Sequence, residues 1–346
     1  MSGKSVFIIG PGFIGWNVLE LLVAEGYRVT GLVRRKEHAK SIEISGAKAV
    51  LGDLHDRPLI ARETAKADVV FHTATADDLP SVEAVLDGVK QRAAEGRPTI
   101  YIHTSGTSVL DDGAKGAFKG EIVYDDKSPA AIDALPDNAP HRPIDLTIVR
   151  TAKELGEKAK LAIMVPPEIY GYNPKHDRIS IQLPTVARFA LVNGYSGHVG
   201  KGLSVESQIH VLDLARAYMV LLHAMEKHPA SWVLDNPYFF CENGKEFSWK
   251  EVGEKVGESL FKAGRIKDPN PKELTDEDFE QLFGEYTSAV LGLNSRSRAL
   301  RLRDLGWEPR EKSIWESWDQ DELPALLREW DTRSRSRSSA YGAPVA

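Results

Sequence analysis

The chain has 346 residues, of which 42% are hydrophobic and 27% charged, a balance typical of a globular protein with a large α/β unit and a second, smaller lobe. Its net charge of −6 disfavours nucleic acid and anionic membranes as main partners. We expect neither a signal peptide nor a membrane span, because no apolar stretch has the required pattern or length. The single cysteine, Cys241, excludes an internal disulfide and fits a reducing compartment, so we expect a cytoplasmic protein.

Apolar runs and helical patterns alternate along the first 170 residues. The runs are near-continuous, which is typical of parallel strands that are covered on both faces. They predict strands at 5–10, 27–33, 47–52, 68–72, 98–104 and 160–165. Helical periodicity lies between them, as at 13–25 and 81–95. This order predicts βαβ units and a doubly wound parallel sheet, the Rossmann fold.

Helical patterns dominate the chain beyond residue 170, and only the run 230–235 resembles a strand. The helical segments are 179–194, 211–227, 247–264 with Ser248 as its N-cap, 276–286 and 321–330. We expect a dinucleotide-binding domain over 1–175, its sheet completed by parts of 205–240, and a mostly helical, mainly substrate-binding lobe over 176–331. The last residues, 332–346, have almost no apolar content and are expected to form a disordered tail.

A glycine-rich loop follows the first predicted strand at once and opens the first predicted helix. It reads Gly10-Pro11-Gly12-Phe13-Ile14-Gly15. In such a loop the first glycine makes a tight turn, the second lets the backbone approach a pyrophosphate, and the third allows close packing of helix and strand. This context predicts a dinucleotide site.

Two arginines, Arg34 and Arg35, stand at the end of the second predicted strand, where an NAD site usually carries an acidic residue. Guanidinium groups can hold a ribose 2′-phosphate, which a carboxylate would repel. The alternative is that these cations merely begin a solvated helix. We predict that NADP(H) is preferred over NAD(H).

With these features the chain resembles the extended short-chain dehydrogenase/reductase family, also called NAD-dependent epimerase/dehydratases, over roughly residues 5–240. The segments SIQLP and GHVGKG are most similar to a fungal branch of that family. The matching motifs, in chain order, are GPGFIG, GDLHD at 52–56, VVFHTATA at 69–76, IHTSGTSVL at 102–110, VPPEIYG at 165–171 and IHVLDLARAY at 209–218.

The resemblance implies which residues contact the cofactor. The glycine loop would hold the pyrophosphate, Asp53 would contact the adenine amine, and the fourth-strand segment would border the nicotinamide ribose. The expected cofactor-binding set is Gly10, Gly12, Phe13, Ile14, Gly15, Arg34, Arg35, Asp53, Leu54, Thr73, Ala74, Thr75, Thr104, Pro166 and Pro167.

The family's catalytic pair, a tyrosine with a lysine four residues later, is missing, because none of the ten tyrosines has a lysine at that spacing. The resemblance places the tyrosine on the helix after the fifth strand, between Ala130 and His141. There the chain offers His141 and, four residues later, Asp145. Tyr124, in the preceding insertion, is a second candidate acid, although tyrosines in loops are usually packing residues.

Two interpretations of His141 stay open. On a helix it would share a face with Asp145, which could orient the imidazole and favour its protonated form, so that His141 acts as the acid. Alternatively, His141 caps the helix and Asp145 is solvated, with catalysis lost or moved. Ser105 is the expected catalytic hydroxyl, with Thr107 in reserve, and Glu168 either faces the ligand or is structural.

These features predict an NADPH-dependent oxidoreductase that acts on a carbonyl or hydroxyl of a small organic molecule. A non-catalytic NADP(H) sensor would explain the missing pair directly, and a sugar-nucleotide epimerase or dehydratase is a third interpretation. The histidines and the single cysteine show no metal-ligand spacing, so we expect no metal. A small molecule is the expected partner, and the sequence leaves the formation of a homodimer open.

Overall fold

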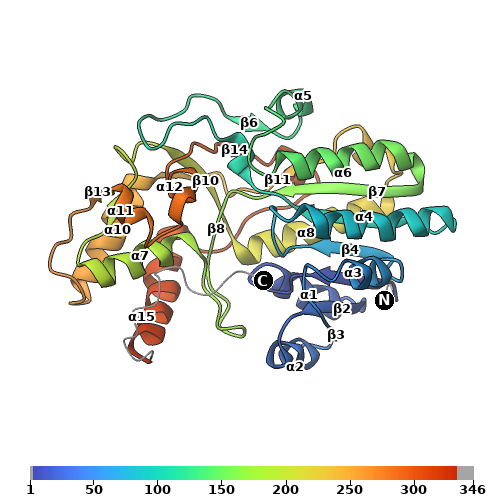
Figure 1. Ribbon diagram of the computed structural model, residues 1–346, viewed down its shortest axis with the longest axis horizontal. Helices are drawn as coiled ribbons and strands as arrows, with labels where there is room; N and C mark the ends of the chain where they lie inside the picture. The colour runs from blue at the N-terminus through green and yellow to red at the C-terminus, as the bar shows by residue number, and fades with distance from the viewer. Residues whose placement is uncertain (1–2, 333–346) are drawn as a thin grey trace.

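The computed structural model describes residues 3–332 and contains a parallel sheet of seven strands, which lies in the right half of the view in Figure 1. The strand order is β11-β7-β5-β4-β1-β2-β3. The strands are β1 (Ser5–Ile9), β2 (Arg28–Val33), β3 (Lys48–Leu51), β4 (Val69–His72), β5 (Thr99–Thr104), β7 (Ala159–Val165) and β11 (Tyr238–Phe240). The doubly wound Rossmann fold and its first six strands are therefore confirmed.

Helices cover both faces of this sheet. The chain runs outward from β1 in one direction and from β4 in the other, and right-handed crossovers then put the connecting helices on opposite faces. Helix α1 packs against α8, while α3, α4 and α6 pack against one another. The helices are α1 (Gly15–Ala24), α2 (Lys36–Ile44), α3 (Arg57–Thr64), α4 (Leu79–Ala94), α6 (Arg142–Leu155) and α8 (Val211–Lys227).

A second lobe surrounds a small sheet of β8 (Glu168–Tyr170), β10 (Val205–His210) and β12 (Glu246–Ser248). Its own core buries Trp249 and Trp318. The helices α7 (Gln182–Asn193), α10 (Trp249–Lys262) and α15 (Leu323–Thr332) supply most of that core. The capping role of Ser248 is confirmed, since its side chain accepts from the Glu251 amide and Glu251 accepts from the Ser248 amide in return.

Two local predictions in this half are wrong. The run 230–235 is a helical turn, α9 (Ser231–Leu234), because the Leu234 amide donates to the carbonyl of Ala230 at 3.0 Å. The strand comes four residues later, as β11. The segment 276–286 is split into α11 (Asp276–Phe279) and a 3₁₀ turn, since Gly284 takes a φ of +59° that a helix cannot hold. Apart from Thr332, the expected tail lies outside the described residues.

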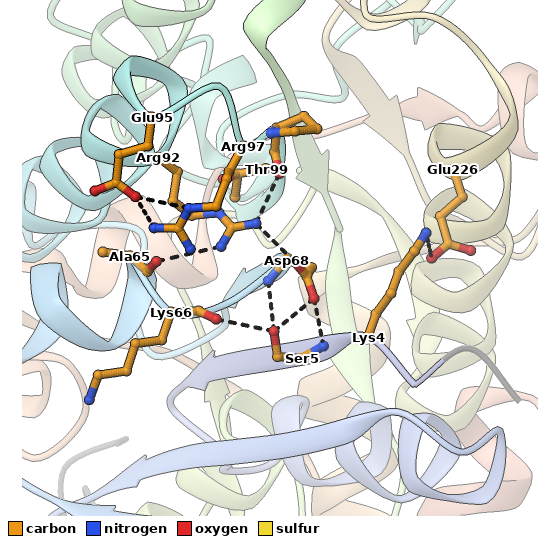
Figure 2. A network of polar contacts seen from close by, with 11 residues as sticks. Lys4, Ser5, Ala65, Lys66, Asp68, Arg92, Glu95, Arg97, Thr99 and Glu226 are labelled. Carbon is orange, nitrogen blue, oxygen red and sulfur yellow. Dashed lines mark hydrogen bonds and ion pairs between the residues drawn. The ribbon is translucent and has the colours of Figure 1, made fainter.

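A buried arginine connects several strands of the sheet at their amino ends (Figure 2). Arg92 of α4 donates to Thr99 at 2.9 Å and to Asp68 at 2.8 Å, and Asp68 accepts from the Ser5 amide and hydroxyl. Burial alone would raise the pKa of Asp68, but these hydrogen bonds outweigh it and hold that pKa below its usual value. The network therefore ties β1, β4, β5 and α4 together.

The chain passes between the lobes more than once. Strand β6 (Tyr124–Asp125) pairs with β14 (Ser297–Arg298), and the buried Asp126 carboxylate accepts from the amides of Phe240, Leu300 and Arg301. Segments that are far apart in the sequence thus close one side of the Rossmann sheet. Within residues 3–332, no helix is both long and apolar enough to cross a membrane.

Candidate functional site

A cavity lies at the carboxyl edge of the parallel sheet, between the two lobes. Strands β1, β4, β5 and β7 all end there, which is where this class of fold binds its ligands. The structure brings together most of the residues expected from the sequence, because the cavity is lined by Gly10, Gly12, Phe13, Ile14, Thr73, Ala74, Thr75, Thr104, Ser105, Thr107, His141, Pro166 and Pro167. Gly15, Arg34, Arg35, Asp53, Leu54, Tyr124 and Asp145 do not line it.

The three glycines of the loop meet different surroundings. A Cβ on Gly10, which has a φ of +83°, would overlap Ala74, and a Cβ on Gly15 would overlap Thr73. A Cβ on Gly12 would meet nothing nearer than 3.9 Å. Gly10 and Gly15 are therefore required by the fold itself, whereas Gly12 leaves space open toward the cavity, as a pyrophosphate would need.

We expect Gly12→Val to abolish dinucleotide binding without unfolding the protein, because the valine would fill that space and touch little else. Fluorescence titration with NADPH and NADH measures the affinity, and a thermal melt measures the fold. Gly15→Ala is the contrasting control, since its methyl group would collide with Thr73 and lower the melting temperature. Normal affinity in a folded Gly12→Val protein would move the site away from this loop.

Arginine side chains lie close together beside the glycine loop, and sequence analysis did not identify one of them, Arg178. Arg178 comes from the segment after β8, and its guanidinium lies 5.7 Å from the ring centre of Trp16 and 3.9 Å from the position of a Gly12 Cβ. Burial and the charge of Arg35 lower the pKa of Arg178. Among the described residues, no carboxylate pairs with Arg178 or Arg35. Two close guanidinium groups without an acid between them fit a phosphate ligand.

Ser105 lies directly after β5 at the edge of the cavity. Its amide donates to the Met164 carbonyl at 2.8 Å, and its hydroxyl donates to the Asp145 carboxylate at 2.9 Å. The other Asp145 oxygen, Oδ1, is buried and has no hydrogen-bond partner in the described structure. Burial raises the pKa of Asp145 to about 7, against the opposing effect of the Ser105 hydrogen bond. Asp145 therefore holds the Ser105 hydroxyl by a buried hydrogen bond, although Asp145 does not itself line the cavity.

The expected pairing of His141 with Asp145 is corrected by the structure. His141 Nδ1 lies 2.7 Å from the Asp77 carboxylate, and His141 Nε2 faces Gly106, at 3.1 Å from the position of a Cβ there. The reason is the backbone: His141 precedes α6 with a left-handed φ of +65°, so its side chain does not stack above the residue four positions later. The hydrogen bond from His141 lowers the pKa of Asp77. The imidazole thus has one nitrogen anchored and the other free for the cavity.

The remaining hydroxyl candidates are engaged elsewhere. Thr107 donates to Ser295 at 3.1 Å, and Thr104 lies 2.5 Å from the Tyr218 hydroxyl. Tyr124 belongs to β6 and does not reach the cavity, and no tyrosine or lysine is among the described lining residues. Of the catalytic candidates predicted from the sequence, Ser105 and His141 therefore remain available at this edge.

Two carboxyl groups also line the cavity. Glu168 begins β8 and Glu206 lies in β10, and both side chains are buried. Glu168 was singled out from the sequence by its place in the VPPEIYG motif, whereas Glu206 lies in the mixed run VESQIH, where no local pattern marks it.

Comparison with known proteins decides the family. A family model described as NAD(P)H-binding matches residues 10–191, more than half of the chain. The chain belongs to this NAD(P)H-binding family. A curated relative, the oxidase ucsJ of an Acremonium species, is 26% identical over 330 residues and covers 88% of this chain and 93% of its own.

Solved structures of an epimerase and of a reductase share the fold. The UDP-glucose 4-epimerase of Thermotoga maritima has a TM-score of 0.63 at 18% identity and covers 94% of this chain and 99% of its own. The yeast methylglyoxal/isovaleraldehyde reductase Gre2, complexed with NADPH, has a TM-score of 0.60 at 16% identity and covers 94% and 99%. The fold expected from the resemblance is therefore confirmed, and the family model confirms that the chain is NAD(P)H-binding by family.

Proposed function

We propose that the protein is an NADPH-dependent oxidoreductase that acts on the carbonyl or hydroxyl group of a small organic molecule. The observation that carries the proposal is that Ser105, His141 and the glycine loop line one cavity, with His141 Nε2 facing Gly106, the neighbour of Ser105. This arrangement puts a hydrogen-bond donor and a proton-carrying group where a substrate oxygen would lie.

The chain's own residues would act on that oxygen. Ser105 would hold it, and a protonated Asp145 would return a hydrogen bond to the serine so that the serine hydroxyl turns toward the substrate. His141, oriented by Asp77, would give its Nε2 proton to the oxygen during reduction and accept it back during oxidation. Bound NADPH would supply the hydride for the carbonyl carbon and leave as NADP⁺.

Three arginines support the preference for NADP(H). Arg34 and Arg35 follow β2, and Arg178 lies beside the glycine loop, where the charge of Arg35 acts on it. A 2′-phosphate would neutralise the repulsion between Arg35 and Arg178. That the yeast reductase with this fold binds NADPH agrees with the proposal.

We expect NADPH to bind more tightly than NADH, and Arg34→Asp, Arg35→Asp or Arg178→Gln to reduce that preference. Each charge-assisted hydrogen bond lost should cost on the order of 1.5–3 kcal/mol of NADPH binding. Titration with both cofactors, and with 2′,5′-ADP against 5′-AMP, isolates the contribution of the phosphate. Arg150→Asp, an exposed change on α6, is the matched control. Equal affinities for both cofactors, unchanged in the variants, would refute the assignment.

A non-catalytic sensor of NADP(H) is the second candidate. The observation in its favour is that no tyrosine or lysine lines the described cavity. A sensor would bind the cofactor yet leave NADPH unoxidised with every member of a panel of aldehydes and ketones. Oxidation of NADPH with any of them supports the enzyme.

A further inference from the structure

In the part of the cavity formed by the second lobe, side chains that can accept hydrogen bonds lie on one face of the small sheet that contains β8 and β10. Strands β8 and β10 run parallel, and Glu168 lies opposite Gln208 in their register. Glu206 precedes Gln208 by two positions in the same strand, so its side chain lies on the same face. Glu168 and Glu206 both line the cavity.

Glu168 is the most unusual of these side chains. It is only 2% exposed, yet neither of its carboxyl oxygens has a hydrogen-bond partner in the described structure, and the Gln208 Oε1 atom beside it has none either. Burial, with the nearby Glu206 and Glu322, raises the pKa of Glu168 well above its usual value. A buried carboxyl without partners destabilises a fold, so its place in a cavity wall points to a ligand that supplies donors.

No side chain of the cavity supplies a compensating charge. Neither lysine nor arginine is among the described lining residues, and the one basic group, His141, is held by Asp77. Glu322, which accepts from the amides of Gly171 and Ser180, adds to the acidic surroundings of Glu168. The rest of this region is apolar, with Ile169, Ile181, Val290 and Leu293.

We propose that the substrate carries a basic nitrogen, as in an amino ketone or amino alcohol, whose ammonium group binds at Glu168 and Glu206 while its oxygen lies at Ser105. The proposal rests on the function proposed above. An ammonium group supplies the N–H donors that Glu168 lacks and a positive charge beside both carboxyls. A diphosphate or a keto acid would meet two carboxyls and no cation, so sugar nucleotides are disfavoured.

A set of small ketones tests this inference. The probes are 4-(dimethylamino)butan-2-one, its uncharged isostere 5-methylhexan-2-one, the neutral donor 4-hydroxybutan-2-one and the anion levulinate. Ligand-observed NMR titration of the full chain with NADP⁺ gives their affinities without turnover. We expect the amino ketone to bind at least about tenfold more tightly than the isostere and the hydroxy ketone, and levulinate to bind most weakly.

Variants assign the effect to the two carboxyls. Glu168→Gln should remove the preference for the amino ketone, and Glu206→Gln should reduce it. Glu43→Gln, an exposed change on α2, should leave it unchanged. Thermal melts should show that Glu168→Gln is at least as stable as the parent, because it removes a carboxyl buried without partners.

Equal binding of the amino ketone and its isostere, or a preference that survives both glutamine variants, would overturn the inference. If the hydroxy ketone alone bound tightly, the inference would be wrong, because the site would then prefer a neutral hydrogen-bond donor to an ammonium group. Failure of the proposed function is a different result: NADPH would then stay unoxidised with every carbonyl, whereas the amino ketone would still bind in the NMR titration.

Discussion

Replacing His141 with glutamine should lower the turnover of carbonyl reduction by about 10²–10⁴-fold, the usual contribution of a general acid, while the affinity for NADPH stays unchanged. The reason is the position of the side chain: Asp77 anchors Nδ1, and Nε2 is left facing the cavity beside Ser105. Glutamine keeps the size and polarity of the group but cannot release a proton. Stopped-flow measurement of NADPH oxidation, with cofactor titration in parallel, separates the two effects.

The pH dependence of the rate identifies the acid. The acid must be protonated for reduction, so a rate that falls with rising pH in the parent and loses this dependence in His141→Gln would identify His141 as the acid. Asp77→Asn should also lower the rate, because the variant loses the carboxylate that orients the imidazole. Tyr124→Phe is the matched control and should change neither rate nor profile. An unchanged profile in His141→Gln would show that His141 is not the acid.

Asp145→Asn should make the protein more stable above neutral pH. The folded-state pKa of Asp145 is raised by burial from 3.8 to about 7. For a raised pKa, the contribution to stability is fully present below pH 3.8 and is lost as pH rises through 7. The charged form is therefore the unfavourable one, by on the order of 2–4 kcal/mol at pH 8. Asparagine keeps an acceptor for Ser105 and carries no charge.

Chemical denaturation of parent and variant at pH 4 and pH 8 measures the effect. The difference in the free energy of unfolding should be small at pH 4 and should favour the variant at pH 8. Asp137→Asn, an exposed change, should show no such dependence. Other buried carboxyls, such as Glu322, whose pKa burial raises to about 7, are present in both proteins and cancel in the comparison. A difference that does not grow with pH would contradict the assignment.

Local patterns were enough to predict the Rossmann half of the fold. Continuous apolar runs that alternate with helical patterns are typical of strands covered on both sides, and the glycine loop between β1 and α1 has one well-known geometry. The run 230–235 misled because its apolar residues fit one helical turn as well as a strand. Nothing local shows that Ser297 and Arg298 pair with Tyr124 and Asp125, since that contact depends on the completed fold.

In the candidate site, too, some residues could be predicted from local patterns and others depend on the completed fold. Residues within the motifs, such as Gly12 and Ser105, follow from spacing. Asp77 does not, because it is 64 positions from His141 and meets it only through the left-handed turn before α6. Arg178 likewise is far from Gly12 in the sequence and approaches it by packing on Trp16 of α1. Helical spacing predicted the partnership of His141 and Asp145, but spacing holds only inside a helix, and His141 stands just outside it.

The outermost strand of the parallel sheet, β11, has a consequence for how the chain is made. A ribosome that has finished β7 must still add roughly seventy residues before β11 can pair with it, a delay of about 4–15 s at ordinary rates of synthesis. During that time the apolar edge of β7 has no neighbouring strand. The hydrogen bond from the Arg301 amide to Asp126 can form only later still, after Arg301 has been added. The nascent chain must therefore be kept from pairing with neighbouring chains until both lobes have emerged, so this Rossmann half matures only after most of the second lobe has been translated.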